Sequence, residues 1–220
     1  MPTSRPSASD PLDRRRALAE QLCQIGRILG ERGWCRATSG NLSAVLTAEP
    51  LRLLITRSGL FKDRLTADDL LLIDGEGRAV EDESGRPSAE ALLHCAIART
   101  LGAGAVLHTH SVAATLLGEH HAGAGGFVLR GYEMLKALEG VASHEEEIFV
   151  PVLPNSQDMG VLCRGFAALA DDRPGLHGFL IAGHGLYAWG ADLDAARRHV
   201  EGLEFLFECA ARKAGLGPVG

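Results

Sequence analysis

Three histidines at the ends of apolar runs are the residues whose spacing points most directly to chemistry. His108 and His110 flank one threonine after the apolar residues 105–107, and His184 lies between two glycines after the apolar residues 179–182. Because strand side chains alternate between two faces, His108 and His110 are expected to point the same way. Three neutral imidazoles that leave one coordination position open are typical of a catalytic zinc site. The alternative is that His108 and His110 are polar residues that cap a strand and that His184 is an unrelated histidine in a turn. Because His184 also follows an apolar run, beside glycines, a shared metal site is favoured.

Three loops combine hydroxyl side chains with glycine or with the start of a helix, as sites for anions do. They are residues 38–43 (Thr-Ser-Gly-Asn-Leu-Ser), 56–59 (Thr-Arg-Ser-Gly) and 86–89 (Arg-Pro-Ser-Ala). Glycine lets backbone N–H groups approach an anion closely, and a helix N-terminus favours negative charge. Each loop alone is more typical of an ordinary turn, yet the three together can converge on one phosphate. Lys62 can add a cation there, although a solvated surface lysine is the default expectation.

Two glutamates, one of them near the proposed anion site, carry carboxylates that can move protons. Glu90 lies in the first turn of the helix that Ser88 is expected to cap, where it can also simply complement the helix dipole. Glu133 lies in residues 131–136 (Gly-Tyr-Glu-Met-Leu-Lys) and by itself resembles an ordinary surface glutamate. Other ring side chains are expected to be packing, surface or satisfied core residues: His94, His120, His121, His144, His177, His199, Tyr187 and Trp189.

The bulk properties fit one ordinary globular domain. The 220 residues carry a formal net charge of −6, which argues against a protein that tracks nucleic-acid phosphates. No apolar run approaches the roughly 18 residues of a membrane span, and the N-terminus lacks the apolar core of a signal peptide. We expect a disordered tail over residues 1–12 and one domain over residues 13–215. The five cysteines form no Cys-x-x-Cys pair, which favours reduced thiols in the cytoplasm.

Periodicity predicts short strands early in the chain and alternating elements later. Leucines at helical spacing after Asp13 predict an opening helix that ends near Gly33, and a helix is expected from Ser88 towards residue 101. Further helices are expected from about 112, over 132–138 and 161–170, and at the C-terminus. Strands are expected at 42–46, 51–56, 148–153, around the histidines, and in a hairpin of 71–73 with 78–80. A Gly/His-rich loop is expected over 118–126. The order predicts one α/β domain with a mixed sheet between helices.

Six segments of the chain resemble the class II aldolase superfamily and occur in its order between about residues 15 and 213. Residues 38–43, 86–90 and 104–111 match motifs shared across the superfamily. Residues 131–138 and 151–158 resemble the branch that dehydrates a phosphorylated ketose, and residues 183–190 complete the set. The resemblance implies a three-layer α/β/α domain with a central mixed, mostly antiparallel sheet. It also implies a homotetramer with active sites at subunit contacts.

The same resemblance implies a site and an activity. One Zn²⁺ per subunit would be held by His108, His110 and His184. The substrate phosphate would lie among Gly40, Asn41, Ser58, Gly59 and Ser88. The implied reaction is dehydration of 5-methylthioribulose 1-phosphate to 2,3-diketo-5-methylthiopentyl 1-phosphate in methionine salvage, without nucleic-acid or membrane partners. Glu133 matches the general acid/base, with a pKa raised by burial, and would reach the site of a neighbouring subunit.

Glu90 leaves the division of roles open. In aldolases and epimerases this position holds the zinc-proximal carboxylate, whereas animal dehydratases have a cysteine there. We favour Glu133 for the elimination and Glu90 as zinc-proximal support. A class II sugar-phosphate aldolase or epimerase is the alternative that Glu90 supports. A non-catalytic assembly module of the adducin-head type is the other alternative, and it would not need the three histidines.

Overall fold

An eight-stranded sheet in the order β3-β2-β1-β4-β8-β7-β6-β5 organises the residues that the structure, a computed structural model, describes: 10–80 and 85–215. All neighbouring strands pair antiparallel except β6 and β7, which are parallel. The strands are β1 (Asn41–Thr47), β2 (Arg52–Thr56), β3 (Leu70–Asp74), β4 (Ala105–Thr109), β5 (Gly126–Leu129), β6 (Ile148–Leu153), β7 (Gly178–Ile181) and β8 (Gly185–Gly190). The predicted mixed, mostly antiparallel sheet is therefore confirmed.

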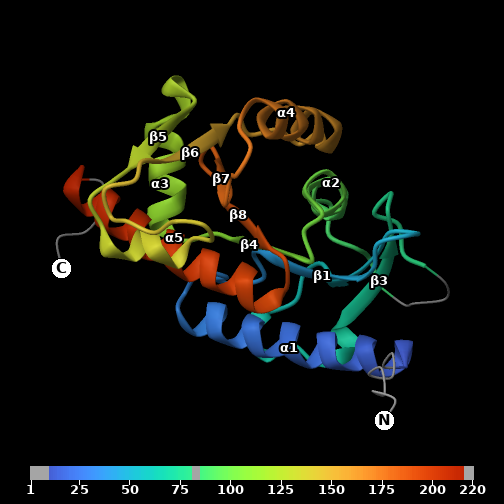
Figure 1. The fold of residues 1–220 in the computed structure, drawn as a ribbon. Helices are drawn as coiled ribbons and strands as arrows, with labels where there is room; N and C mark the ends of the chain where they lie inside the picture. Colours follow the sequence, from blue (N-terminus) through green and yellow to red (C-terminus); the bar gives the residue numbers. More distant parts are fainter. Residues whose placement is uncertain (1–9, 81–84, 216–220) are drawn as a thin grey trace, which may run out of the picture.

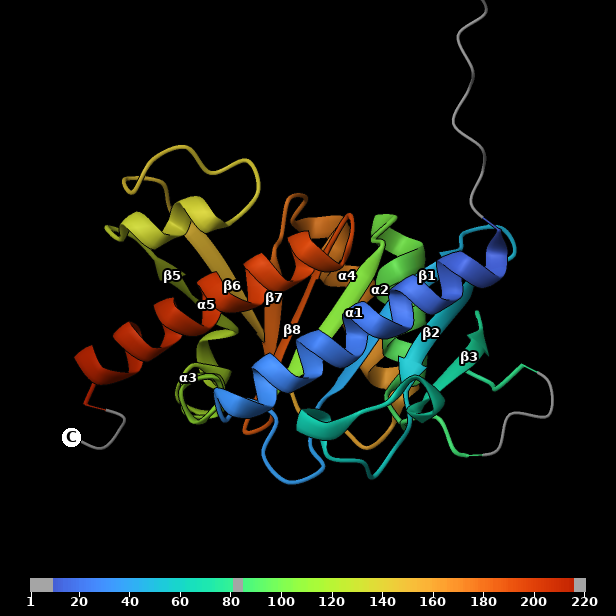
Figure 2. The same cartoon turned by 90° about the horizontal axis from the view of Figure 1, so that it is seen from below.

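Helices cover both faces of this sheet. They are α1 (Pro11–Glu31), α2 (Ala91–Leu101), α3 (Val112–His120), α4 (Met159–Asp172) and α5 (Leu193–Lys213). Figure 1 shows α2 and α4 on one side of the sheet and α1 and α5 on the other, and Figure 2 shows α1 and α5 crossing the strands. Buried residues of α1, α3 and α5 share one core cluster. On the other face, α2 shares a second cluster with α4 and a third with β2 and β3. The expected three-layer α/β/α architecture is confirmed.

Strand β4 lies near the centre of the sheet, between β1 and β8, and its residues alternate between the two layers. Ala105 and Leu107 pack in the cluster with α1 and α5, while Val106 packs in the cluster with α2 and α4. The same alternation places His108 on the α2/α4 side and Thr109 on the α5 side. Asn41 pairs with His108 across the β1–β4 ladder, and Tyr187 of β8 pairs with it on the other side.

Several element boundaries differ from the sequence predictions for local reasons. Glu90, rather than Ser88, precedes the first residue of α2, and the Ser88 hydroxyl accepts a hydrogen bond from the Glu90 N–H at 3.3 Å. The expected second strand of the 71–73/78–80 hairpin is reduced to one bridge, between Ile73 and Ala79. The predicted Gly/His-rich loop ends in β5, and the predicted helix at 132–138 is a 3-10 helix, η4 (Glu133–Ala137).

The predicted tail over residues 1–12 overlaps the first residues of α1. Residues 1–9 of the predicted tail lie outside the described residues, and Pro11 and Leu12 already belong to α1, which Asp10 caps by accepting from the Leu12 N–H. None of the described helices is both long enough and apolar enough to cross a membrane.

Candidate metal centre and carboxylate site

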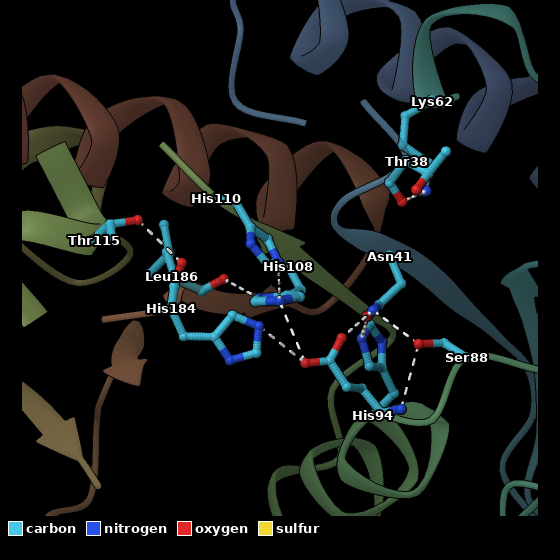
Figure 3. Close-up of polar contacts among 11 residues, drawn as sticks. Thr38, Asn41, Lys62, Ser88, His94, His108, His110, Thr115, His184 and Leu186 are labelled. Atoms are coloured by element: carbon cyan, nitrogen blue, oxygen red, sulfur yellow. Dashed lines mark hydrogen bonds and ion pairs between the residues drawn. The ribbon is translucent and has the colours of Figure 1, made fainter. Parts of the chain in front are cut away.

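The three histidines singled out by their spacing converge at one end of the sheet. His108 and His110 project from the end of β4, and His184 lies in the turn that joins β7 to β8. Figure 3 shows the three rings turned towards one another. Nε2 of His108 lies 2.8 Å from Nε2 of His110, and ligand atoms of the three residues all lie within 4.8 Å of one another. One divalent metal ion can therefore be reached by all three side chains.

The electrostatics of these rings suit a metal ion. Nδ1 of His108 donates to the Leu186 carbonyl at 2.8 Å, which leaves its Nε2 with a free lone pair. Burial, together with His110 and His184, holds the pKa of His108 well below its ordinary value. Burial and the neighbouring His184 and Lys62 lower the pKa of His110 to about 4. Both rings are therefore neutral at pH 7, which is the form in which imidazole binds metals.

Glu90 brings a carboxylate to the same point. Its Oε1 lies 3.3 Å from Nε2 of His184 and 3.6 Å from Nε2 of His108. Its Oε2 accepts a hydrogen bond from Nδ2 of Asn41 at 2.5 Å. Because Asn41 holds one oxygen, the other oxygen faces His108 and His184, where it can accept or return a proton of a bound substrate.

The three loops predicted around a phosphate lie next to one another. Nδ2 of Asn41 also donates to the Ser88 hydroxyl at 3.1 Å, which joins the first loop to the third. The Ser58 N–H donates to the Arg86 carbonyl at 3.1 Å, which joins the second loop to the third. Gly40 has φ +76°, and a Cβ there would lie 2.7 Å from the His108 carbonyl oxygen, so only glycine fits this approach. Gly59, at φ +79°, has open space on its Cβ side.

Lys62 lies behind these loops, and the default expectation of a solvated surface lysine is wrong. Its side chain is buried, and its Nζ donates to the Thr38 carbonyl at 2.9 Å and to the Leu60 carbonyl at 2.7 Å. The Thr38 carbonyl belongs to the first loop (Figure 3), and Leu60 directly follows the second loop, so one amine connects the two segments. Burial lowers the pKa of Lys62, while Cys35 and Glu90 act in the opposite direction.

Glu133 is not brought to this centre within one chain. It lies on η4, which packs against α5, and its side chain is 70% exposed. Its oxygens pair with Nζ of Lys136 at 2.6 Å and with Nδ1 of His144 at 3.1 Å. The hydrogen bond and charge of Lys136 hold the pKa of Glu133 below its ordinary value. The raised pKa expected from burial is therefore wrong for the single chain, because no residue that the structure describes buries this carboxylate.

Two further residues around the centre were not singled out for chemistry by the sequence analysis. Tyr187, which the sequence predicts to be a packing residue, stacks on the His108 ring with the ring centroids 4.0 Å apart. Glu204 of α5 is buried, and its Oε1 accepts from the Thr109 hydroxyl at 2.6 Å, on the opposite face of the strand that carries the histidines. The spacing of Val200, Glu204 and Phe207 along one helix face was a signal that could have identified a buried carboxyl.

Burial raises the pKa of Glu204 to about 7, which makes the stability of the protein depend on pH. Between the unfolded value of 4.5 and about 7, the folded chain holds one proton more than the unfolded chain, so stability falls as pH rises. Glu204→Gln keeps an acceptor for Thr109 and removes this titration. Its free energy of unfolding relative to the wild type is expected to rise between pH 5 and pH 8, by roughly 3 kcal/mol at most. Urea unfolding at both pH values measures this difference.

Glu119→Gln, on the exposed surface near the end of α3, is the control for that measurement. It is expected to change stability equally at both pH values. A Glu204→Gln variant whose stability relative to the wild type is the same at pH 5 and pH 8 would contradict the raised pKa.

Comparisons with known proteins relate this chain to a family of known enzymes and domains. The family described as "Class II Aldolase and Adducin N-terminal domain" matches residues 20–211. A methylthioribulose-1-phosphate dehydratase of Sorangium cellulosum is 42% identical over 201 residues, 91% of this chain and 94% of that protein. One of Yersinia enterocolitica is 48% identical over 198 residues, 86% of this chain and 92% of that protein.

Solved structures show the same fold. The L-fuculose-1-phosphate aldolase from Thermus thermophilus is 26% identical, with a TM-score of 0.71 over 93% of this chain and 99% of that one. Another L-fuculose 1-phosphate aldolase, at 23% identity, has a TM-score of 0.74 over 92% and 88% of the two chains. The matched family covers most of the chain, and the chain therefore belongs to the class II aldolase and adducin N-terminal domain family.

Proposed function

We propose that this protein is a zinc-dependent hydro-lyase that converts 5-methylthioribulose 1-phosphate into 2,3-diketo-5-methylthiopentyl 1-phosphate in methionine salvage. The observation that carries the proposal is the meeting of three imidazoles and the Glu90 carboxylate beside three phosphate-type loops. Relatives at 42% and 48% identity over nearly their whole length support this substrate. All five cysteines are free, which supports a reducing cytoplasm as the site of action.

The reaction removes a proton from C3, next to the C2 carbonyl, and the hydroxyl group from C4. A divalent metal held by His108, His110 and His184 would supply Lewis-acid polarisation of the carbonyl. The loops around Asn41 and Ser88 would hold the phosphate, and this remote binding orients the reacting carbons. Water then leaves with one proton added to the C4 hydroxyl, and the enol that remains becomes the diketone by moving a proton to C4.

Two carboxylates divide the proton transfers in this proposal. Glu90 faces the imidazoles in its own chain, so we assign it the C3 proton. Glu133 protonates the departing C4 hydroxyl from a neighbouring subunit of a homotetramer. Its exposed position in the single chain supports this assignment, because a residue that completes another subunit's site must be accessible before assembly.

Lys62→Met tests the role proposed for the loops. The variant keeps a long side chain but loses both hydrogen bonds that join the Thr38 and Leu60 carbonyls. At about 1 kcal/mol for each bond, the KM for the phosphorylated substrate is expected to rise roughly 10-fold to 30-fold with a smaller change in kcat. Steady-state kinetics measure both values. A normal KM in a folded variant would remove Lys62 from the support of the phosphate site.

The proposed reaction is tested by incubating the zinc-loaded protein with 5-methylthioribulose 1-phosphate and following the products by mass. We expect a product lighter by one water, whose formation stops when a chelator removes the metal and resumes when zinc is returned. Unchanged turnover after complete metal removal would contradict the metal requirement.

The same assay decides between dehydration and aldol cleavage, which Glu90 at the metal centre also suits. Aldol cleavage would break the C3–C4 bond and release dihydroxyacetone phosphate together with a methylthio aldehyde. In that case Glu90 alone would carry the proton transfer and Glu133 would lose its assigned role.

A further inference from the structure

We propose that His94 is a positioning residue of this site: it fixes the direction of the Asn41 side-chain amide, so that the amide nitrogen faces Glu90 and Ser88. The inference rests on the proposed function, which gives Glu90 and the Ser88 loop their roles. His94 lies apart from the three histidines of the metal centre, four residues after Glu90 in α2, and its side chain is fully buried.

The fold places two polar residues of β1 against this ring. Leu42 and Ala44 of β1 pack in the α1/α5 cluster, so the alternating residues Asn41 and Ser43 face α2. Nδ1 of His94 lies 2.7 Å from the Ser43 hydroxyl, and its Nε2 contacts Oδ1 of Asn41 (Figure 3). Both ring nitrogens therefore have a partner, and both partners come from one face of one strand.

The chemistry of the groups gives this chain of hydrogen bonds one direction. A carboxylate only accepts hydrogen bonds, so the end of the Asn41 amide that contacts Glu90 must be its nitrogen. The other end, which contacts His94, is then the carbonyl oxygen, and Nε2 of His94 must donate to it. Burial lowers the pKa of His94 to about 3, so the ring carries one proton at pH 7 and Nδ1 accepts from the Ser43 hydroxyl.

This direction matters because the opposite one would place two acceptors against each other. A flipped Asn41 amide would turn Oδ1 towards the Glu90 carboxylate and leave the Ser88 contact without its present donor. With its proton on Nε2, His94 also disfavours the flipped amide, because two N–H donors would then face each other. His94 thereby supports the link between the Glu90 carboxylate and the Ser88 hydroxyl through a single amide nitrogen, although its own side chain has no hydrogen bond to either group.

Two substitutions separate this role from simple packing. In His94→Gln the side-chain nitrogen can occupy the place of Nε2 and donate to Asn41, whereas in His94→Asn it reaches only the place of Nδ1. His94→Asn is expected to lower kcat/KM about 100-fold with unchanged metal content, because a misplaced reacting group costs about that much. His94→Gln is expected to recover most of the loss. Equal losses in the two folded variants would overturn the proposal.

A double-mutant cycle with Asn41→Ala tests whether His94 acts through Asn41. If it does, His94→Asn/Asn41→Ala is expected to have the kcat/KM of Asn41→Ala within about 2-fold. Effects that multiply in the double variant would show an independent structural role and overturn the proposal.

The tautomer of His94 provides a readout that does not need activity. Long-range ¹H–¹⁵N NMR of the wild-type protein is expected to show His94 protonated at Nε2 and bare at Nδ1 between pH 5 and pH 8. The Nδ1–H tautomer would overturn the proposal whatever the activity. The expected tautomer in a protein that does not dehydrate the substrate would instead count against the proposed function while supporting the direction of the Asn41 amide.

Discussion

His108→Ala is expected to remove metal binding and turnover together. The residue supplies one of three imidazoles, and its lone pair is aimed at the centre by the hydrogen bond from its Nδ1 to the Leu186 carbonyl. Lewis-acid stabilisation contributes several kcal/mol, and about 1.4 kcal/mol corresponds to a factor of ten, so kcat/KM should fall by roughly 10³-fold or more. Metal content by mass spectrometry and steady-state kinetics on the same preparation measure both effects.

His120→Ala is the matched control, because His120 is an exposed histidine at the end of α3, outside the metal centre. It is expected to keep the metal and the wild-type rate. A His108→Ala protein that turns over at the wild-type rate with no bound metal would contradict the metal site.

Glu133→Gln is expected to keep the metal and lose turnover. The amide has the shape of the carboxyl group but cannot exchange a proton, and general acid–base catalysis contributes about 10²-fold to 10⁴-fold. The structure places this carboxylate on the surface of the single chain, away from His108, His110 and His184, so the loss must arise in an assembly. Metal analysis, kcat and the oligomeric state by light scattering are the measurements. Glu145→Gln, on the same surface, is the control with unchanged activity.

Mixing two inactive variants tests the assignment of Glu133 to a neighbouring subunit. Unfolded and refolded together, His108→Ala and Glu133→Gln subunits are expected to recover part of the activity. A site that takes its histidines from one variant and its glutamate from the other would be intact. Mixtures that remain as inactive as either variant would place Glu133 in its own chain's site or outside the reaction.

The sequence predicts the meeting of the three histidines well because the information for it is local. Strand alternation alone places His108 and His110 on one face, and the glycines around His184 indicate the turn that returns it to the same end of the sheet. Strand β6 falls at the predicted residues 148–153 for the same reason. The resemblance to the class II aldolase superfamily supplies the rest of the architecture.

The supporting contacts are less accessible to sequence reasoning because they join distant segments. The carbonyl partners of Lys62 come from two loops, and one of them is 24 residues away in the chain. Thr109 and Glu204 are 95 residues apart in the chain, and no periodic pattern in the sequence predicts their contact. The sequence predicts His94 only as a surface or satisfied core histidine, while its proposed role in directing Asn41 depends on how β1 packs against α2. The proposed role of Glu133 depends on contacts between subunits rather than within one chain, because its proposed partners lie in another subunit.

The most direct test of the central claim, loss of water with the carbon skeleton intact, is ¹³C NMR with 5-methylthioribulose 1-phosphate labelled at both C3 and C4. Our account expects the C3 signal to move to that of a ketone and the C4 signal to that of a methylene, with the one-bond coupling between the two labelled carbons retained. Labels that separate into two molecules, with loss of that coupling, would contradict dehydration and establish carbon–carbon cleavage instead.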